Sequence, residues 1–306
     1  MLPNGRDLGT IAGRSAEEPR RPRSWPEGPL PGRRRSSARG GWLSHCRGII
    51  LKSAREIERI RAAGRVVNRV LTQVREMARP GVTTAEMNAL AECLIAEAGG
   101  LALFKGVVNP QARFAFPAVL CTSVNHELVH GIPNDRPLKE GDIVGVDCGV
   151  KLEGYCGDSA TTVPIGRIAS RAQELLDVTR GALDVAIDTV RPGRMWSEVA
   201  REIQSFVERH DFSVVREFVG HGIGRDMHEE PKVPNYWDRR QNKADFQLAP
   251  GVVLAIEPMV NEGTADVVFG DEDRWVVVTR DGKLCAHFEH TVAVTETGAD
   301  VLTDGR

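Results

Sequence analysis

Two aspartates occupy strand positions that are normally apolar, within residues 141–163 (GDIVGVDCGVKLEGYCGDSATTV). Apolar and small residues alternate on both sides of a polar turn that ends in glycine, which predicts a β-hairpin. With Leu152 and Glu153 at the tip, Asp147 lies directly opposite Asp158, at a Cβ separation of about 5 Å. Either this face is solvated, or the two carboxylates share a cation, because buried carboxylates require a proton or a metal ion between them.

The elements that must position these carboxylates form an internal repeat. Residues 54–78 and 172–190 have apolar residues at helical spacing. Each stretch is followed by a related phrase, RPGVTTAEM at 79–87 and RPGRMWSEV at 191–199. The first phrase carries a capping-box signature that opens a second helix. The order of these phrases predicts two pseudo-symmetric halves, each made of two helices and a hairpin.

Each half also contributes carboxylates and a histidine. The segment 138–148 (LKEGDIVGVDC) aligns without gaps on 248–258 (LAPGVVLAIEP), and the final strands and the two His-Gly-Ile phrases align in the same order. In this alignment Asp147 corresponds to Glu257, Asp158 to Glu289, and His130 to His221. His221 is the best nitrogen ligand, because glycines on both sides leave it sterically free. Four carboxylates that meet at the centre would be strongly destabilising without cations, so one or two divalent metal ions are expected there. Oxygen ligands with one imidazole favour Mn, Fe, Co or Zn.

The motifs resemble those of a known family. The phrases are CTSVNHELVHGIP, GDIVGVDCGV, GYCGDS, GHGIGRDMHEEP, AIEPMV and FEHTVAV. They are similar to those of the type I methionine aminopeptidases, from about Gly48 to the C-terminus. This resemblance implies an α/β (α+β) pita-bread fold, the creatinase/aminopeptidase-like fold, with two pseudo-symmetric halves around a central antiparallel sheet. It also implies a metal-dependent hydrolase that removes the initiator methionine from nascent proteins and peptides during protein maturation.

The resemblance further implies a role for individual residues. The ligands of two divalent ions (Co, Mn, Fe or Zn), which would hold a bridging water, would be Asp147, Asp158, His221, Glu257 and Glu289, with Asp158 and Glu289 bridging both ions. Glu257 would also accept a proton from the water nucleophile, and His130 and His228 would contact the substrate, with His228 at the scissile carbonyl. The methionine side chain would be bound by Cys121, Met227 and Trp275. No pattern supports a role for His126, His210, His287 or His290.

The chain differs from the family at the rim of this pocket. Residues 104–121 (FKGVVNPQARFAFPAVLC) lack a His-Gly pair that is common upstream of the cysteine, and the 107–113 loop is longer. Met227 replaces an aromatic residue before HEEP, although its flexible thioether is compatible with a methionine pocket.

Composition sets the remaining expectations. The 306 residues, 41% hydrophobic and 27% charged, suit a globular protein, and no apolar run approaches the roughly 18 residues of a membrane span. Residues 1–47 hold ten Arg and four acidic residues, so we expect a disordered extension followed by a single catalytic domain at 48–306. The extension is an inert leader, a transit peptide or a basic arm that weakly contacts the ribosome, and the first of these is favoured.

Six scattered cysteines without a C-x-x-C pair indicate reduced thiols in the cytoplasm. The family leads us to expect a monomer.

Two other functions stay open. A proline-specific peptidase of the same fold is disfavoured by the VHGIP and HEEP phrases. A catalytically silent pita-bread protein could bind peptides or RNA, but such proteins typically lose metal ligands and this sequence has lost none.

Overall fold

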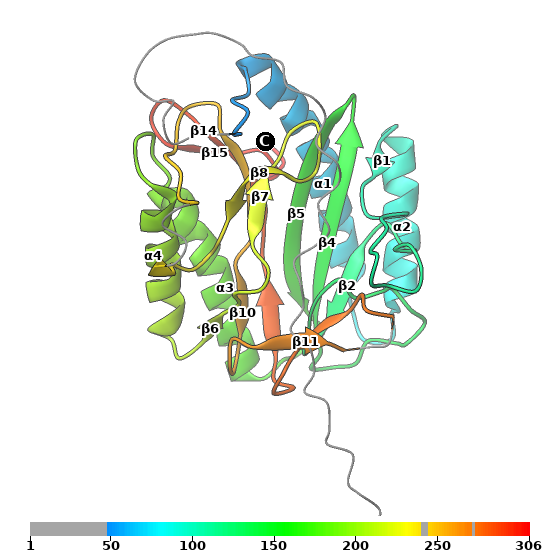
Figure 1. Ribbon diagram of the computed structural model, residues 1–306. Helices are drawn as coiled ribbons and strands as arrows, with labels where there is room; N and C mark the ends of the chain where they lie inside the picture. Colours follow the sequence, from blue (N-terminus) through cyan, green and yellow to red (C-terminus); the bar gives the residue numbers. More distant parts are fainter. Residues whose placement is uncertain (1–47, 240–243, 271–272) are drawn as a thin grey trace, which may run out of the picture.

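The computed structural model describes residues 48–239, 244–270 and 273–306. The predicted disordered extension at 1–47 therefore lies outside the described residues. Figure 1 shows strands through the centre of the molecule, with the first helix pair on one side and the second pair on the other.

Four long helices form where the sequence predicts them. They are α1 (Ala54–Met77), α2 (Thr84–Glu97), α3 (Ser170–Thr189) and α4 (Trp196–Glu208). The capping box predicted at Thr83 is present, because Thr83 accepts a hydrogen bond from the backbone N–H of Glu86 and the Glu86 carboxylate accepts one in return. Ser53 and Glu56 cap α1 in the same way. In the described part of the chain, no helix is both long and apolar enough to cross a bilayer.

The strands form four antiparallel sheets among the described residues. The first half contains the sheet β1-β4-β2 with β5 also paired to β4, made of β1 (Leu101–Ala102), β2 (Cys121–Val124), β4 (Ile143–Leu152) and β5 (Tyr155–Pro164). The second half contains the sheet β15-β14-β9-β7-β8, made of β15 (Ala299–Val301), β14 (His290–Val294), β9 (Val253–Ile256), β7 (Gly220–Gly222) and β8 (Glu229–Val233). A third sheet joins β13 (Cys285–His287), β10 (Met259–Asn261) and β6 (Ser213–Val214). The fourth joins β11 (Val267–Phe269), β12 (Val277–Thr279) and β3 (Glu127–Val129). The expected antiparallel centre is present, divided into four sheets.

The two halves repeat the same backbone hydrogen bonds. The N–H of Gly81 donates to the carbonyl of Leu138 at 2.8 Å, and the N–H of Gly193 donates to the carbonyl of Leu248 at 2.8 Å. These four residues are the ones that the sequence repeat aligns. The predicted internal repeat is therefore a structural repeat.

Each half has its own hydrophobic core, and a smaller cluster joins them. One core lies between α1, α2 and the β4–β5 hairpin, and the other lies between α3, α4 and the strands of the second half. The joining cluster consists of Ile60, Tyr155, Cys156, Ile223, Val253, Ala293 and Leu302. Burial of these apolar side chains across the junction holds the halves together, so polar groups from both can meet at one place.

The predicted register of the β4–β5 hairpin is wrong by two residues. Leu152 pairs with Tyr155, so the turn is at Glu153 and Gly154, and Asp147 pairs with Ala160 instead of Asp158. The reason is the turn type: both turn residues have positive φ, 48° and 83°, as a two-residue hairpin turn of type I′ requires. Because the shift is even, Asp147 and Asp158 still share one face.

We expect Gly64→Ala to lower the free energy of unfolding by about 2 kcal/mol. A Cβ atom at Gly64 in α1 would overlap the backbone carbonyl of Leu302, which cannot move independently of the C-terminal segment. The matched control is Gly181→Ala in α3, where the added atom meets only the ring edge of Phe206 at 2.8 Å and the ring can turn away. Urea denaturation of both variants should show destabilisation at Gly64 and little change at Gly181. Equal losses would contradict the packing argument.

Candidate metal centre

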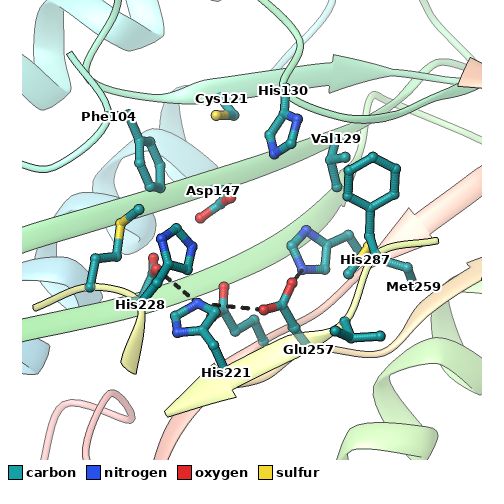
Figure 2. Close-up of a pocket in the computed structure, with 15 residues that line it drawn as sticks. Phe104, Cys121, Val129, His130, Asp147, His221, His228, Glu257, Met259 and His287 are labelled. Atoms are coloured by element: carbon teal, nitrogen blue, oxygen red, sulfur yellow. Dashed lines mark ion pairs between the residues drawn. The ribbon is translucent and has the colours of Figure 1, made fainter. Parts of the chain in front are cut away.

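The predicted ligands line one cavity between the two halves. Its volume is about 80 Å³, and its walls include all five of them: Asp147, Asp158, His221, Glu257 and Glu289. Figure 2 shows Asp147 of the first half facing His221 and Glu257 of the second. Residues separated by more than 140 positions in the sequence thus meet in a single site.

Three of these residues form a compact donor group. The ligand atoms of Asp158, His221 and Glu289 all lie within 4.8 Å of one another. The Nε2 atom of His221 is 4.0 Å from Oδ2 of Asp158 and 3.6 Å from Oε1 of Glu257. This separation suits donor atoms that face a common ion between them.

The carboxylates have oxygens that the protein does not satisfy. Oδ1 of Asp147, Oδ1 of Asp158 and Oε1 of Glu289 are buried and have no hydrogen-bond partner among the described residues. Burying such atoms without a partner is costly, and native proteins rarely do so. Carboxylate oxygens and one imidazole are the donor set of hard-to-borderline divalent ions, so the residues present fit the metal ions that the sequence predicts.

Burial and mutual repulsion act on the protons of this cluster. Burial raises the pKa of Asp147 to about 7. Burial first, and then repulsion from neighbouring carboxylates, raises the pKa of Asp158 and of Glu289 well above the usual range. Burial and Asp147 do the same to the pKa of Glu257. The carboxylates therefore hold protons unless a cation replaces them.

His221 presents the correct nitrogen for a metal ion. Its Nδ1 atom lies 3.0 Å from the carbonyl oxygen of Gly222. Because a carbonyl only accepts hydrogen bonds, Nδ1 carries the proton and Nε2 is left with a lone pair that faces the carboxylates. Burial lowers the pKa of His221 to about 4, which keeps the imidazole neutral.

The glycines that flank His221 have a different role from the one predicted. A Cβ atom at Gly220 would overlap the carbonyl of Ala255, and one at Gly222 would overlap the carbonyl of Glu230. The glycines thus allow β7 to pass closely between β9 and β8, which fixes the position of His221.

Hydrogen bonds between the halves bring their carboxylates together. The N–H of Glu289 donates to the carbonyl of Ala160 at 2.9 Å, and Oγ1 of Thr291 donates to the carbonyl of Asp158 at 2.8 Å. The hydroxyl of Ser159 donates to the carbonyl of Glu289 at 2.5 Å. The middle of strand β5 in the first half is therefore joined to Glu289 and to the start of β14 in the second half.

The two histidines predicted to contact substrate both line the cavity. His130 has a φ of 61° and packs edge-on against Phe218, with ring centroids 5.6 Å apart. His228 lies edge-on to His221 at a centroid distance of 4.3 Å. Burial and neighbouring imidazoles lower the pKa of both residues, to about 3 for His130, so both are neutral donors or acceptors near pH 7.

The predicted methionine-pocket residues are only partly at the cavity. Cys121 and Met227 line it, but Trp275 lies behind it in an apolar cluster, 5.2 Å from the ring of Phe116. The indole N–H of Trp275 donates to the carbonyl of Phe114 at 2.9 Å, so Trp275 supports the segment that follows the longer loop. In that loop, Asn109 donates to the carbonyl of Arg274 at 3.2 Å.

Sequence reasoning missed several residues of the cavity wall. They are Phe104, Val129, Phe218, Val219, Met259 and His287. His287 was left without a role, although one signal was present: it precedes Glu289 by two residues, a spacing that places both on one strand face. The apolar members gave no signal, because they reach the cavity only through tertiary packing.

The fold and the site together define a metallopeptidase. Residues 58–296 match the model of metallopeptidase family M24, and the chain belongs to this family. Among its relatives, methionine aminopeptidase 1 of Bacillus subtilis (strain 168) is 48% identical over 255 residues, which cover 83% of this chain and 99% of the relative. The methionine aminopeptidase of Clostridium perfringens (strain 13 / Type A) is 44% identical over 255 residues, covering 83% and 98%. The resemblance predicted from the motifs is confirmed.

Solved structures give the same result for the fold. The methionine aminopeptidase from Thermotoga maritima has a TM-score of 0.78 at 41% identity, covering 83% of this chain and 99% of that one. The methionine aminopeptidase from Rickettsia prowazekii has a TM-score of 0.77 at 37% identity, with the same coverage. An Xaa-Pro dipeptidase from Bacillus anthracis shares the fold, with a TM-score of 0.64 at 19% identity and coverage of 84% and 62%. The predicted pita-bread fold is confirmed.

Proposed function

We propose that this chain is a metal-dependent aminopeptidase that removes methionine from the N-terminus of peptides and nascent proteins. The observation that carries the proposal is the convergence of five metal-binding side chains in a cavity whose wall also contains thioether and aromatic side chains, among them Met227 and Phe104. The metal-binding groups suit the free amino group and first carbonyl of a peptide, and the apolar wall suits an unbranched apolar side chain.

The carboxylates and His221 hold the divalent ions in this proposal. When bound, such ions lower the pKa of water and polarise the scissile carbonyl. Their number, expected to be two, and their identity among Co, Mn, Fe and Zn are part of the proposal. Glu257 accepts the proton of the attacking water in this proposal, as the resemblance implies, and its place in the cavity wall, with Oε1 3.6 Å from Nε2 of His221, supports that role.

The neutral histidines position the substrate. His228 lies beside His221 and donates a hydrogen bond to the scissile carbonyl as negative charge develops on its oxygen. His130 approaches from the first half and contacts the substrate backbone. Cys121 and Met227 contact the methionine side chain, and Trp275 supports this wall from behind.

Hydrolysis of Met-Ala-Ser by metal-loaded protein tests this function. Purified protein stripped with a chelator and reloaded with Mn or Co should release free methionine, and the stripped protein should not. Release of Xaa from an Xaa-Pro peptide, with Met-Ala-Ser left intact, would instead support the proline-specific alternative. Elemental analysis tests the other alternative, a catalytically silent protein that only binds peptides or RNA. If protein purified with added metal still contains no transition metal, it has no functional metal centre.

We expect His228→Ala to lower kcat and kcat/KM together by about 100-fold. The reason is that His228 contacts the carbonyl oxygen mainly in the transition state, and the metal ligands stay intact. His126→Ala, which changes an exposed histidine outside the cavity, is the control and should keep full activity. Steady-state kinetics with measured metal content checks this prediction. A rise in KM alone would assign His228 to ground-state binding.

The remaining properties belong to the same proposal. Residues 48–306 act as one catalytic unit, since both halves supply ligands to one cavity. The protein acts as a monomer in the cytoplasm, and the Arg-rich segment 1–47 makes at most a weak contact with the ribosome. Sedimentation of the full chain, alone and with ribosomes, tests both statements.

A further inference from the structure

His287 is a buried histidine in the cavity wall whose ring has no role in the proposed mechanism. Its side chain is about 5% exposed. The backbone is fixed on both sides, because His287 pairs with Met259 in the sheet and its N–H and carbonyl both bond the hydroxyl of Thr162 at 2.9 Å. Its Nε2 atom has no hydrogen-bond partner among the described residues. The backbone is therefore fixed, and the buried ring brings a polar atom without a hydrogen-bond partner to the cavity wall.

The group that this nitrogen faces is Glu257. Nε2 of His287 is 3.7 Å from Oε2 of Glu257, and Nε2 of His221 is 3.6 Å from Oε1 of the same carboxylate. Figure 2 shows Glu257 between the two imidazoles, with a dashed line to each. Asn235 donates to the carbonyl of Glu257 at 3.0 Å, which fixes the backbone but leaves the carboxylate free to rotate.

We propose that His287 is a positioning residue for Glu257: its Nε2–H donates to Oε2 and thereby keeps Oε1 directed at the metal centre. An ionised carboxylate only accepts hydrogen bonds, so a nitrogen that faces it contributes as a donor. The distance of 3.7 Å is slightly longer than a hydrogen bond, and such contacts commonly shorten when a site is loaded. Groups that orient metal ligands in this way typically contribute 10- to 100-fold in metal affinity.

The inference rests on the proposed metal centre, but not on the identity of the peptide substrate. Binding of Mn(II) to chelator-stripped protein is therefore the main measurement, made by titration calorimetry without substrate. The variants are His287→Leu and His287→Met, which remove the donor, and His287→Gln, whose amide N–H can replace it at a similar distance from the backbone. His126→Leu is the matched control at an exposed position outside the cavity.

We expect the apolar variants to weaken Mn(II) binding by about 10- to 100-fold and to lower kcat at saturating metal. His287→Gln should restore most of both, and His126→Leu should leave both unchanged. The visible spectrum of the Co(II) form should keep the band positions of the unsubstituted protein in His287→Gln, because no ligand is lost.

Two outcomes would overturn the inference. If His287→Gln is as impaired as the apolar variants and its Co(II) spectrum changes, the imidazole is itself a ligand. If a folded apolar variant binds Mn(II) as tightly as the unsubstituted protein, Glu257 needs no second partner. Failure of the proposed function is recognised separately, since the unsubstituted protein would then bind metal and release no methionine.

Discussion

Asp158→Asn is expected to lower kcat/KM by about 1,000-fold, equivalent to about 4 kcal/mol of transition-state stabilisation. Asp158 belongs to the compact donor group: its ligand atom lies within 4.8 Å of those of His221 and Glu289, and burial, followed by the charges of Asp147 and Glu257, raises its pKa. An amide has the same shape but brings no charge to a divalent ion. The variant should therefore fold, bind less metal and fail at the chemical step.

A second measurement on this variant separates loss of metal from misfolding. In the metal-free state the amide removes a buried carboxyl group whose pKa is raised, so Asp158→Asn should be at least as stable as the unsubstituted protein at pH 8. Asp177→Asn makes the same chemical change on the exposed face of α3, where Asp177 accepts a hydrogen bond from Gln173, and should keep full activity. The assignment of Asp158 as a ligand fails if Asp158→Asn retains normal metal content and activity.

The metal-free protein should become less stable as the pH rises above 7. Asp147, Asp158, Glu257 and Glu289 have folded-state pKa values above their unfolded values. The folded state then holds more protons than the unfolded chain, so the stability from these groups is complete below about pH 4 and is lost as the pH rises through the folded values. The slope is about 1.4 kcal/mol per pH unit for each extra proton held.

The stability of the metal-free protein is best measured above pH 7, because the buried histidines also change the stability at lower pH. The pKa values of His130, His221 and His287 are lowered to about 3 or 4, so their contribution to stability is lost as the pH falls below 6.5. Between about pH 4 and 6.5 the histidines and carboxylates have opposite effects. Above that range the histidines are neutral in both states, and between pH 7 and 8 the carboxylates dominate. Closer to pH 9 the buried cysteines Cys121, Cys148, Cys156 and Cys285, whose pKa values burial raises, also lower the stability.

Bound metal should abolish this pH dependence. A divalent ion replaces the protons, and at 1,000 times its dissociation constant it adds about 4 kcal/mol of stability. Urea denaturation between pH 7 and 8, on chelator-treated and Mn-loaded protein, provides the measurement, because the buried cysteines act only at higher pH. If the metal-free protein keeps constant stability over this range, the four carboxyl groups do not share a site that requires a cation.

The sequence by itself determined the parts of this protein that depend on short-range patterns. Helices α1 and α3 follow from apolar spacing, and the capping box at Thr83 follows from two residues three positions apart. The repeat also required no structure, because Gly81 and Gly193 belong to phrases that align in order. It indicated that both halves supply carboxylates to one centre, and their convergence in the cavity agrees with that prediction.

Only the tertiary structure decided what depends on long-range contacts. The exact hairpin register follows from a type I′ turn at Glu153 and Gly154, which moves Asp147 opposite Ala160. The indole of Trp275 packs in a buried apolar cluster and donates to the carbonyl of Phe114, outside the cavity wall, although the resemblance suggested a pocket residue. His287 comes within 3.7 Å of Glu257, thirty residues earlier in the sequence, because β13 lies beside β10 and Glu257 precedes β10 by two residues. Spacing along the chain specifies local hydrogen bonds and strand faces, but the meeting of distant side chains depends on how the buried surfaces of the two halves fit together.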